Sequence, residues 1–332
     1  MKILFIYNYK IFKNWASKTY EYKINEIIKN EMFDSFDIDN INENIKLENY
    51  EKVIFGWNTI PISKYYTIKH EFYKKKIKNL ESKDEIGKKI MPFMNIPNKY
   101  LIIQDFNCPH DYKNGLLSLI EYLEKHKINN LITPYLKNNG IKFIKSKIKN
   151  IKIFYLPHHI NSNFFKNYNL EKEYDIFLFG NISPKFYPFR NRIFKLLAKN
   201  KDKFNFKFMD GIRNYFRFNE KVSNSNLSKM INKSWITICT SSKYNLILGK
   251  YIETAMSNSV ICGNIPTDGL STFKNNIIEI NDKMTDNQIL EIIQSYLVNK
   301  KKLEKLSTNC CKKMESYKLK DYSNKLYELI SE

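Results

Sequence analysis

The sequence predicts an α/β protein made of two tandem doubly wound, Rossmann-like domains that face a cleft. Short apolar runs alternate with longer segments of helical periodicity, and this series starts twice, once at Lys2 and again after Glu173. A polar, Asn-rich stretch, residues 156–173, separates the two series. Such alternation is typical of helices that cover a mostly parallel sheet. Two sheets in series are therefore expected, with ligands near the carboxyl ends of their strands.

In the first series, Lys2–Tyr7 predicts a buried strand because five of its residues form an apolar run. The segment Trp15–Asn30 carries apolar residues on one helical face. Further strands are expected over Lys52–Gly56, Tyr100–Gln104, Asn130–Thr133 and Ile151–Leu156. Helices are expected over Tyr65–Leu80, Asn114–His126 and Tyr135–Asn139.

The second series ends in the clearest helix signal of the chain, a capping box at Thr285–Gln288 that precedes an apolar face. Strands are expected over Tyr174–Phe179, Phe204–Phe208, Trp235–Thr240, Ser259–Cys262 and Ile277–Ile280. Helices are expected over Pro188–Lys199, Leu227–Asn232, Lys250–Met256, the segment after the capping box, Lys302–Tyr317 and Leu319–Ile330.

Length and composition favour a folded protein of about two domains. The chain has 332 residues, 43% hydrophobic and 15% aromatic. Its longest uncharged run, Thr254–Thr267, is rich in Ser, Asn and Thr and is too short to cross a bilayer. The apolar run near the N-terminus is shorter than that of a secretory signal, so we expect a cytoplasmic protein. The five cysteines are scattered and indicate neither a disulfide framework nor a zinc site.

The formal charge of +21 would attract phosphates, nucleic acid or an anionic membrane surface. Part of this charge can reflect a composition biased toward Lys, Asn and Ile, so charge alone does not identify the partner. The sequence contains neither G-x-G-x-x-G after the first strand nor a P-loop. An anion site must therefore be sought elsewhere.

The first candidate anion site follows the strand that ends at Gly180. A glycine lets the backbone approach a phosphate closely, and Lys185, Arg190 and Arg192 come next, at the start of a helix. This arrangement suits a diphosphate. The alternative is that Gly180 merely ends a strand and that the basic side chains are solvated.

The second candidate is the pair Lys250 and Glu253, three residues apart at a helix start. A carboxylate in this place can accept both hydroxyl groups of a ribose while the ammonium group faces a phosphate. The alternative is an ordinary ion pair on a helix surface.

Around these residues the chain resembles the GT-B glycosyltransferases, in particular the family-one-like and spore-maturation-type group. The likeness rests on the run Gly249–Gly269, on the strand from Tyr174 to Gly180 with Arg190 after it, and on the segment Leu156–Asn161. It covers most of the C-terminal half. In the N-terminal half only the alternation of strands and helices agrees.

The resemblance implies that Glu253 binds the ribose of a nucleotide sugar and that Arg190, with Lys185 or Lys250, binds its diphosphate. Retaining members carry a further glutamate eight positions before the ribose-binding one, where this chain has Asn245. The stereochemical outcome therefore stays open. Lys243 or Tyr244 could contact the sugar hydroxyl groups instead.

The resemblance also assigns domain roles. It implies an acceptor domain over residues 1–155, an interdomain segment over 156–173 and a nucleotide-sugar domain over 174–316. The last segment, 317–332, would be a closing helix that could pack back on the N-terminal domain.

In the N-terminal half, the segment after the strand at Tyr100–Gln104 holds the candidates for a catalytic base. Asp105, His110 and Asp111 could each take a proton from an acceptor hydroxyl group. Asp and Asn beside a proline are equally common in ordinary turns.

Together these observations predict a nucleotide-sugar-dependent glycosyltransferase that acts on a glycan, a lipid or a protein. The donor is expected to be UDP- or GDP-linked, and no cofactor or metal is expected, since no D-x-D stands in a suitable context. Peripheral contact with an anionic membrane stays open. The alternative is a nucleic-acid-binding or DNA-modifying protein that uses the strong basic charge, although no nucleic-acid-binding motif is present.

Overall fold

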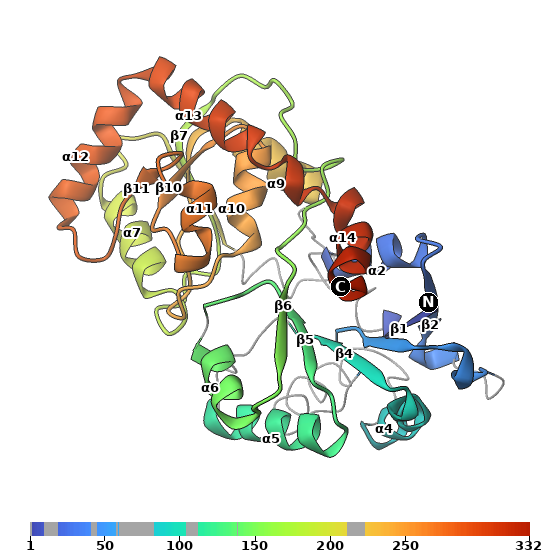
Figure 1. The fold of residues 1–332 in the computed structure, drawn as a ribbon. Coiled ribbons are helices and arrows are strands. Elements are labelled where there is room, and N and C mark those ends of the chain that lie inside the picture. The colour runs from blue at the N-terminus through green and yellow to red at the C-terminus, as the bar shows by residue number, and fades with distance from the viewer. Residues whose placement is uncertain are drawn as a thin grey trace. The chain divides into compact units, whose positions relative to one another are not determined.

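The computed structural model describes residues 2–9, 19–40, 45–57, 59, 83–103, 112–137, 139–210 and 223–332. These residues form two compact units. Unit 1 consists of Met1–Pro157 together with Lys320–Glu332, and unit 2 consists of His158–Leu319. Figure 1 shows the strands and helices of each unit. No helix in the described part of the chain is both long enough and apolar enough to cross a membrane.

Unit 1 contains a six-stranded, fully parallel sheet in the order β2-β1-β3-β4-β5-β6. Its central strands are buried on both faces, as expected where helices cover a parallel sheet. The strands are β1 (Ile3–Tyr7), β2 (Phe33–Asp37), β3 (Lys52–Phe55), β4 (Asn98–Ile102), β5 (Asn130–Thr133) and β6 (Lys152–Tyr155). The helices are α2 (Thr19–Ile28), α4 (Lys83–Ile90), α5 (Tyr112–Lys125), α6 (Asn139–Lys147) and α14 (Tyr322–Ser331).

The last helix of the chain, α14, belongs to unit 1 and packs against α2. The side-chain amide of Asn30 donates to Ser323 Oγ at 3.1 Å and to Asn324 Oδ1 at 2.8 Å. The rings of Phe33 and Tyr327 meet edge to face at 6.1 Å. These contacts fix the C-terminal helix beside the first βα unit.

Unit 2 contains a five-stranded parallel sheet in the order β11-β10-β9-β7-β8. Its core includes Ile176, Leu178, Ile236 and Ile238 from the two central strands. The strands are β7 (Tyr174–Gly180), β8 (Phe206–Asp210), β9 (Ser234–Ile238), β10 (Val260–Gly263) and β11 (Ile278–Glu279). The helices are α7 (Pro188–Lys199), α9 (Asn224–Asn232), α10 (Gly249–Met256), α11 (Leu270–Phe273), α12 (Asp286–Leu297) and α13 (Lys300–Lys312).

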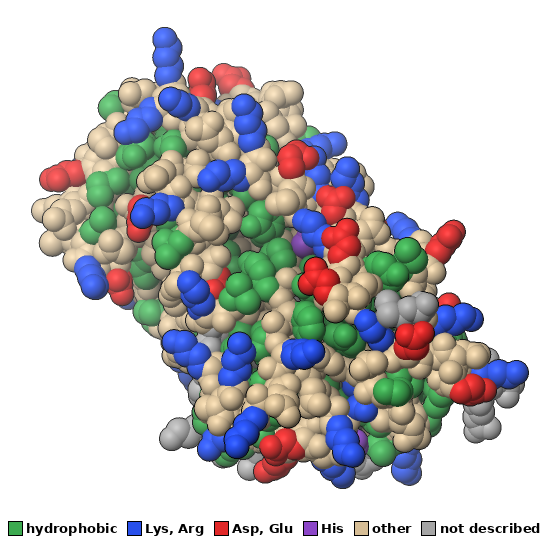
Figure 2. Space-filling view, viewed as in Figure 1, with side chains coloured by type: hydrophobic (Ala, Val, Ile, Leu, Met, Phe, Trp, Pro, Cys, Tyr) green, Lys and Arg blue, Asp and Glu red, His purple; other side chains and the backbone are tan. Residues whose placement is uncertain are grey.

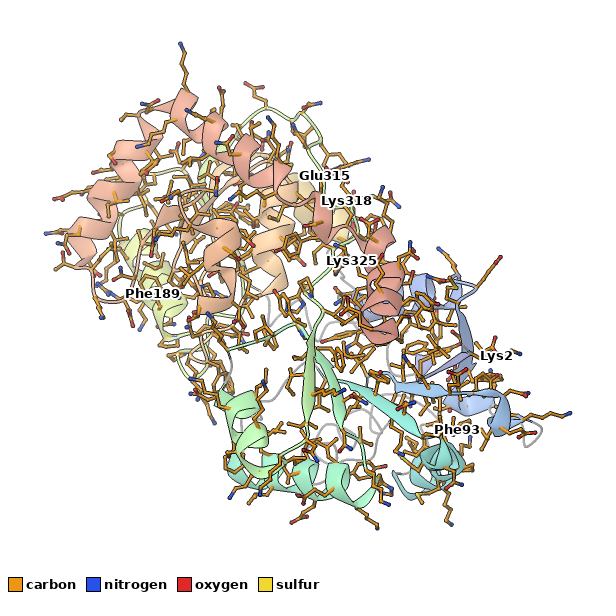
Figure 3. The ribbon with its side chains drawn as sticks, viewed as in Figure 1. Lys2, Phe93, Phe189, Glu315, Lys318 and Lys325 are labelled. Atoms are coloured by element: carbon orange, nitrogen blue, oxygen red, sulfur yellow. The ribbon has the colours of Figure 1, made fainter. Side chains whose placement is uncertain are left out.

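Local signals in the C-terminal half agree with the structure. The capping box is confirmed, since Gln288 N donates to Thr285 Oγ1 at 3.2 Å and Thr285 N donates to Gln288 Oε1 at 2.8 Å. Phe189, at the start of α7, packs against the core of unit 2 (Figure 3). After α13, Glu315 and Lys318, both labelled in Figure 3, form an ion pair at 2.5 Å.

In the N-terminal half one prediction was wrong and one strand was missed. The segment Tyr135–Asn139 is not a helix, because α6 begins only at Asn139 and runs to Lys147. Strand β2 was not expected, since its five residues include two aspartates and only Phe33 is buried. The helix expected over Tyr65–Leu80 lies outside the described residues.

Candidate functional site

The carboxyl edge of the sheet in unit 2 is built from closely approaching loops. Strands β7 and β10 end in Gly180 and Gly263, and Cys239 follows β9. A Cβ added to Gly263 would lie 1.6 Å from the carbonyl oxygen of Cys239, so only glycine fits there. The backbone segments that follow β9 and β10 are thus held against each other at the edge where ligands of doubly wound sheets gather.

Gly180 lies beside two cationic side chains. Its φ of +93° lies in the left-handed region that favours glycine. A Cβ added to Gly180 would lie 3.6 Å from Arg190 Nη1 and 3.9 Å from Lys250 Nζ. Since Arg190 comes from α7 and Lys250 from α10, the start of each helix brings one cation to the end of β7. We call Gly180, Arg190 and Lys250 the cationic cradle.

Lys250 is buried, with only 7% of its surface exposed. Its Nζ donates to the carbonyl oxygen of Phe179 at 2.8 Å and lies 4.2 Å from the centroid of the Phe179 ring. Burial, with a further contribution from the nearby Arg190 charge, lowers the pKa of Lys250 to about 7. An ammonium group has three N–H donors, and the described residues accept a hydrogen bond from one of them.

Arg190 is also buried, at 3% exposure, and its guanidinium group connects two loops. Nε and Nη2 donate to Thr240 Oγ1 at 3.1 Å and to the Thr240 carbonyl oxygen at 2.7 Å. Nη1 donates to the carbonyl oxygen of Asn181 at 2.9 Å, and the guanidinium carbon lies 4.1 Å from the ring centroid of Tyr187. Burial lowers the pKa of this guanidinium group. Arg190 thus holds the segments after β7 and β9 together and keeps a positive charge beside Gly180.

Glu253 lies one helical turn after Lys250 on α10 and is partly exposed. Its Oε1 lies 3.7 Å from the position of a Cβ added to Gly249, so the carboxyl group turns back toward the helix start. Burial raises the pKa of Glu253 to about 7, and the positive charge of Lys250 opposes this shift. This placement suits a carboxyl group that binds the hydroxyl groups of a ligand held at the cradle.

Lys185, Lys243 and Tyr244 form a second, outer group around Phe186. The Nζ atoms of both lysines lie 5.7 Å from the Phe186 ring centroid, and Lys243 Nζ lies 5.1 Å from that of Tyr244. The backbone N–H of Lys243 donates to the carbonyl oxygen of Phe186 at 2.9 Å. Both ammonium groups belong to exposed residues, so they can reach an anion without a large desolvation cost.

The remaining candidate residues are not part of the cationic cradle in the described structure. Asn245 has a φ of 55° and donates to Thr267 Oγ1 at 3.0 Å. Arg192 does not belong to the cradle, because it forms an ion pair with Asp286 at 2.7 Å and donates to the backbone just before α12. The base candidates Asp105, His110 and Asp111 lie outside the described residues.

Sequence reasoning missed the residues that support the cradle. Tyr251 OH donates to the carbonyl oxygen of Asn264 at 2.7 Å, and the Asn264 side chain is hydrogen-bonded to Ser241. Thr240 and Asn181 accept the hydrogen bonds of Arg190. The one signal that could have found Thr240, Asn181 and Asn264 is their position, since each follows the end of a strand at the ligand-binding edge of the sheet.

Solved structures with the same architecture cover the whole chain. HepE of Anabaena, in complex with UDP-glucose, matches with a TM-score of 0.59 and 9% identity over 100% of this chain and 99% of HepE. Sucrose-phosphate synthase from Thermosynechococcus elongatus matches with a TM-score of 0.57 and 9% identity over 100% of this chain and 98% of the synthase. TarM matches with a TM-score of 0.53 and 13% identity, over 96% of this chain and 58% of TarM.

These neighbours share the GT-B architecture. The chain has the GT-B fold. The prediction of two doubly wound, Rossmann-like domains is thereby confirmed, since each of the two series of strands forms its own parallel sheet. No protein-family model matches the chain, and no curated protein sequence is similar to it. With identities near 10%, the likeness concerns the fold.

Proposed function

We propose that the chain is a glycosyltransferase that transfers a sugar from a nucleoside diphosphate sugar to a glycan, a lipid or a protein. The observation that carries the proposal is the cationic cradle. A diphosphate bound beside Gly180 would accept hydrogen bonds from the two N–H groups of Lys250 that have no acceptor among the described residues. Arg190, which is bonded to the backbone of Thr240, would supply a second positive charge. Glu253, one turn further along α10, would accept hydrogen bonds from the ribose.

In the transfer, the bond between the anomeric carbon and the diphosphate oxygen breaks, and the acceptor oxygen forms a new bond to that carbon. The acceptor hydroxyl loses its proton to a base, for which Asp105, His110 and Asp111 of the N-terminal half are the candidates. Negative charge grows on the departing nucleoside diphosphate. Lys250, Arg190 and the start of α10 would stabilise that charge, so the reaction would need no divalent metal.

Structures of HepE contain UDP or UDP-glucose, and pneumococcal GtfA, an O-GlcNAc transferase with a TM-score of 0.50 and 12% identity, was solved with UDP and GlcNAc. UDP-linked sugars are therefore the first donors to test, with GDP-linked sugars next. These neighbours favour an enzyme over the nucleic-acid-binding alternative. A cytoplasmic location is consistent with a soluble nucleotide-sugar donor.

The direct test is a thermal-shift series with UDP, UDP-sugars and their GDP, ADP and dTDP counterparts. A ligand that binds only the native state raises the melting temperature Tm, by an amount that grows with its concentration above Kd. We expect one nucleotide family to raise Tm in the wild type and not in Lys250→Met. A chain that none of these nucleotides stabilises at millimolar concentration would contradict the proposal.

A further inference from the structure

One segment of unit 1 carries many lysines and no acidic residue. Between Glu124 and Glu171 the sequence contains nine lysines and neither Asp nor Glu. Six of these lysines lie after β5, on α6 and at the start of β6. All six are exposed: Lys137, Lys142, Lys145, Lys147, Lys149 and Lys152. We call them the α6–β6 surface, and Figure 2 shows Lys and Arg side chains over the part of the face that α6 occupies in Figure 1.

The opposite edge of the same sheet has the opposite charge. Over residues 21–51, which include β2 and most of α2, the sequence has nine acidic residues and three lysines. Because β2 and β6 are the two outer strands of the sheet, acidic and basic residues are separated across unit 1. A bias toward lysine in the overall composition would not remove acidic residues from one edge and gather them at the other.

Folding of this region does not explain the lysines. The inner face of α6 is held by Ile141 and Ile144, and Ile148 follows them one turn later, all buried. Lys142, Lys145 and Lys149 lie on the outer face, and no ion pair involving them is found within the described residues. Six like charges held close together repel one another, so their clustering is unfavourable for the isolated protein.

We propose that the α6–β6 surface docks unit 1 onto the anionic headgroups of a lipid bilayer. Each lysine near such a surface adds to the attraction, and clusters of four to eight basic residues are typical of segments that bind anionic lipids. Leu136, beside Lys137, is 45% exposed and supplies an apolar side chain at the rim of the surface. This inference rests on the charge of unit 1 and does not require the proposed glycosyltransferase activity.

The residue types favour a bilayer over a nucleic acid. All four arginines of the chain lie between residues 190 and 217, so the α6–β6 surface has none. Arginine provides the planar, bidentate contacts that phosphodiester and base recognition commonly use, whereas lysine acts as a point charge that suits a fluid layer of headgroups.

The test is co-sedimentation of the full chain with vesicles of phosphatidylcholine alone or with 30% phosphatidylglycerol. We expect binding only to the anionic vesicles and its loss in 0.5 M NaCl, where surface charges are screened. Triple reversal, Lys142→Glu, Lys145→Glu and Lys149→Glu, should lower the partition coefficient at least about 100-fold, since each lysine contributes about fivefold.

The matched control reverses three exposed lysines of unit 2, Lys195, Lys199 and Lys203. This variant has the same net charge as the first triple variant, so general electrostatics would weaken both variants alike. Equal losses, or wild-type binding of the first variant, would overturn the proposal. A duplex RNA or DNA that binds the wild type while anionic vesicles do not would also overturn it and identify a nucleic-acid surface instead.

Discussion

Replacing Lys250 with methionine should stabilise the nucleotide-free protein and at the same time weaken nucleotide binding. The pKa of Lys250 falls from 10.5 to about 7 on folding, which corresponds to about 5 kcal/mol against the charged form inside the fold. At pH 7 the unfolded chain keeps this lysine charged, so the cost is carried by the folded state. Methionine has a similar length and no charge, and it removes that cost.

The substitution also removes the hydrogen bond from Nζ to the Phe179 carbonyl oxygen at 2.8 Å. An unsatisfied buried carbonyl group costs about 1–3 kcal/mol. The net expectation for Lys250→Met is therefore a gain of about 2–4 kcal/mol in the free energy of unfolding at pH 7. This gain would raise the Tm of unit 2 by several degrees.

The same substitution should weaken nucleotide binding. A diphosphate would lose the charged hydrogen bonds from Lys250, each contributing about 1.5–3 kcal/mol, so Kd should rise at least about 100-fold. Isothermal titration calorimetry with the nucleotide found by thermal shift measures this Kd, and calorimetry without nucleotide measures Tm. A variant that is less stable and binds nucleotide as the wild type does would refute the reasoning and make Lys250 a structural cation.

Lys23 offers a matched control for this experiment. It is 2% exposed, lies in unit 1 with its Nζ 5.7 Å and 5.2 Å from the ring centroids of Trp57 and Tyr322, and has a pKa that burial lowers to about 7. Lys23→Met should therefore also raise Tm. It should leave the nucleotide Kd unchanged, which separates the loss of a buried charge from the loss of a ligand contact.

Four further outcomes are expected. Glu253→Ala should raise the nucleotide Kd by about 10- to 100-fold in a protein that stays folded by circular dichroism, and an unchanged Kd would remove Glu253 from the site. Arg190→Ala should lower kcat as well as affinity, because charge on the diphosphate grows during transfer, and wild-type kcat would contradict a role in catalysis. In Glu253→Gln the carboxyl group no longer titrates, so the pH dependence of binding reports on Lys250. Affinity for a nucleotide sugar should fall as pH rises from 6.5 to 8.5, because Lys250 loses its proton above a pKa of about 7. An affinity that does not change over this pH range would contradict the role of Lys250 in binding the diphosphate. Transfer should persist in excess EDTA, whereas loss of activity that Mn²⁺ or Mg²⁺ restores would indicate a metal-dependent enzyme.

The sequence predicted the elements whose signals are local. Strand β7, helix α7 and the capping box of α12 each combine an apolar pattern with a clear start or end, and the structure has all three. The edge strand β2 was missed because it is stabilised by backbone pairing with β1 rather than by its own apolar residues. Helix α6 was misplaced because its buried isoleucines lie among lysines, which obscured their helical spacing.

For the candidate site, the sequence identified which residue types gather at the end of β7 but not how each is used. Arg190 and Arg192 are two positions apart on α7, yet one connects the strand-end loops and the other pairs with Asp286. The two roles can be told apart only in the folded structure, because Thr240 lies 50 positions from Arg190 in the chain and Asp286 lies 94 positions from Arg192. The cationic cradle itself depends on the left-handed φ of Gly180. A glycine permits this conformation, but its presence in the sequence does not show that the backbone adopts it.

Buried lysines show why Lys250 is the cation most suited to a ligand. Lys172 is half-buried, and desolvation lowers its pKa to about 8. Its Nζ donates to three backbone carbonyl groups, those of Asn232, Ser234 and Asn258, at 2.6–3.0 Å, so all its donors are used to join the amino ends of strands. Lys250 has a larger shift of pKa and gives one hydrogen bond to the described residues. Two of its three N–H donors have no acceptor among the described residues, and we propose that a ligand beside Gly180 accepts from them.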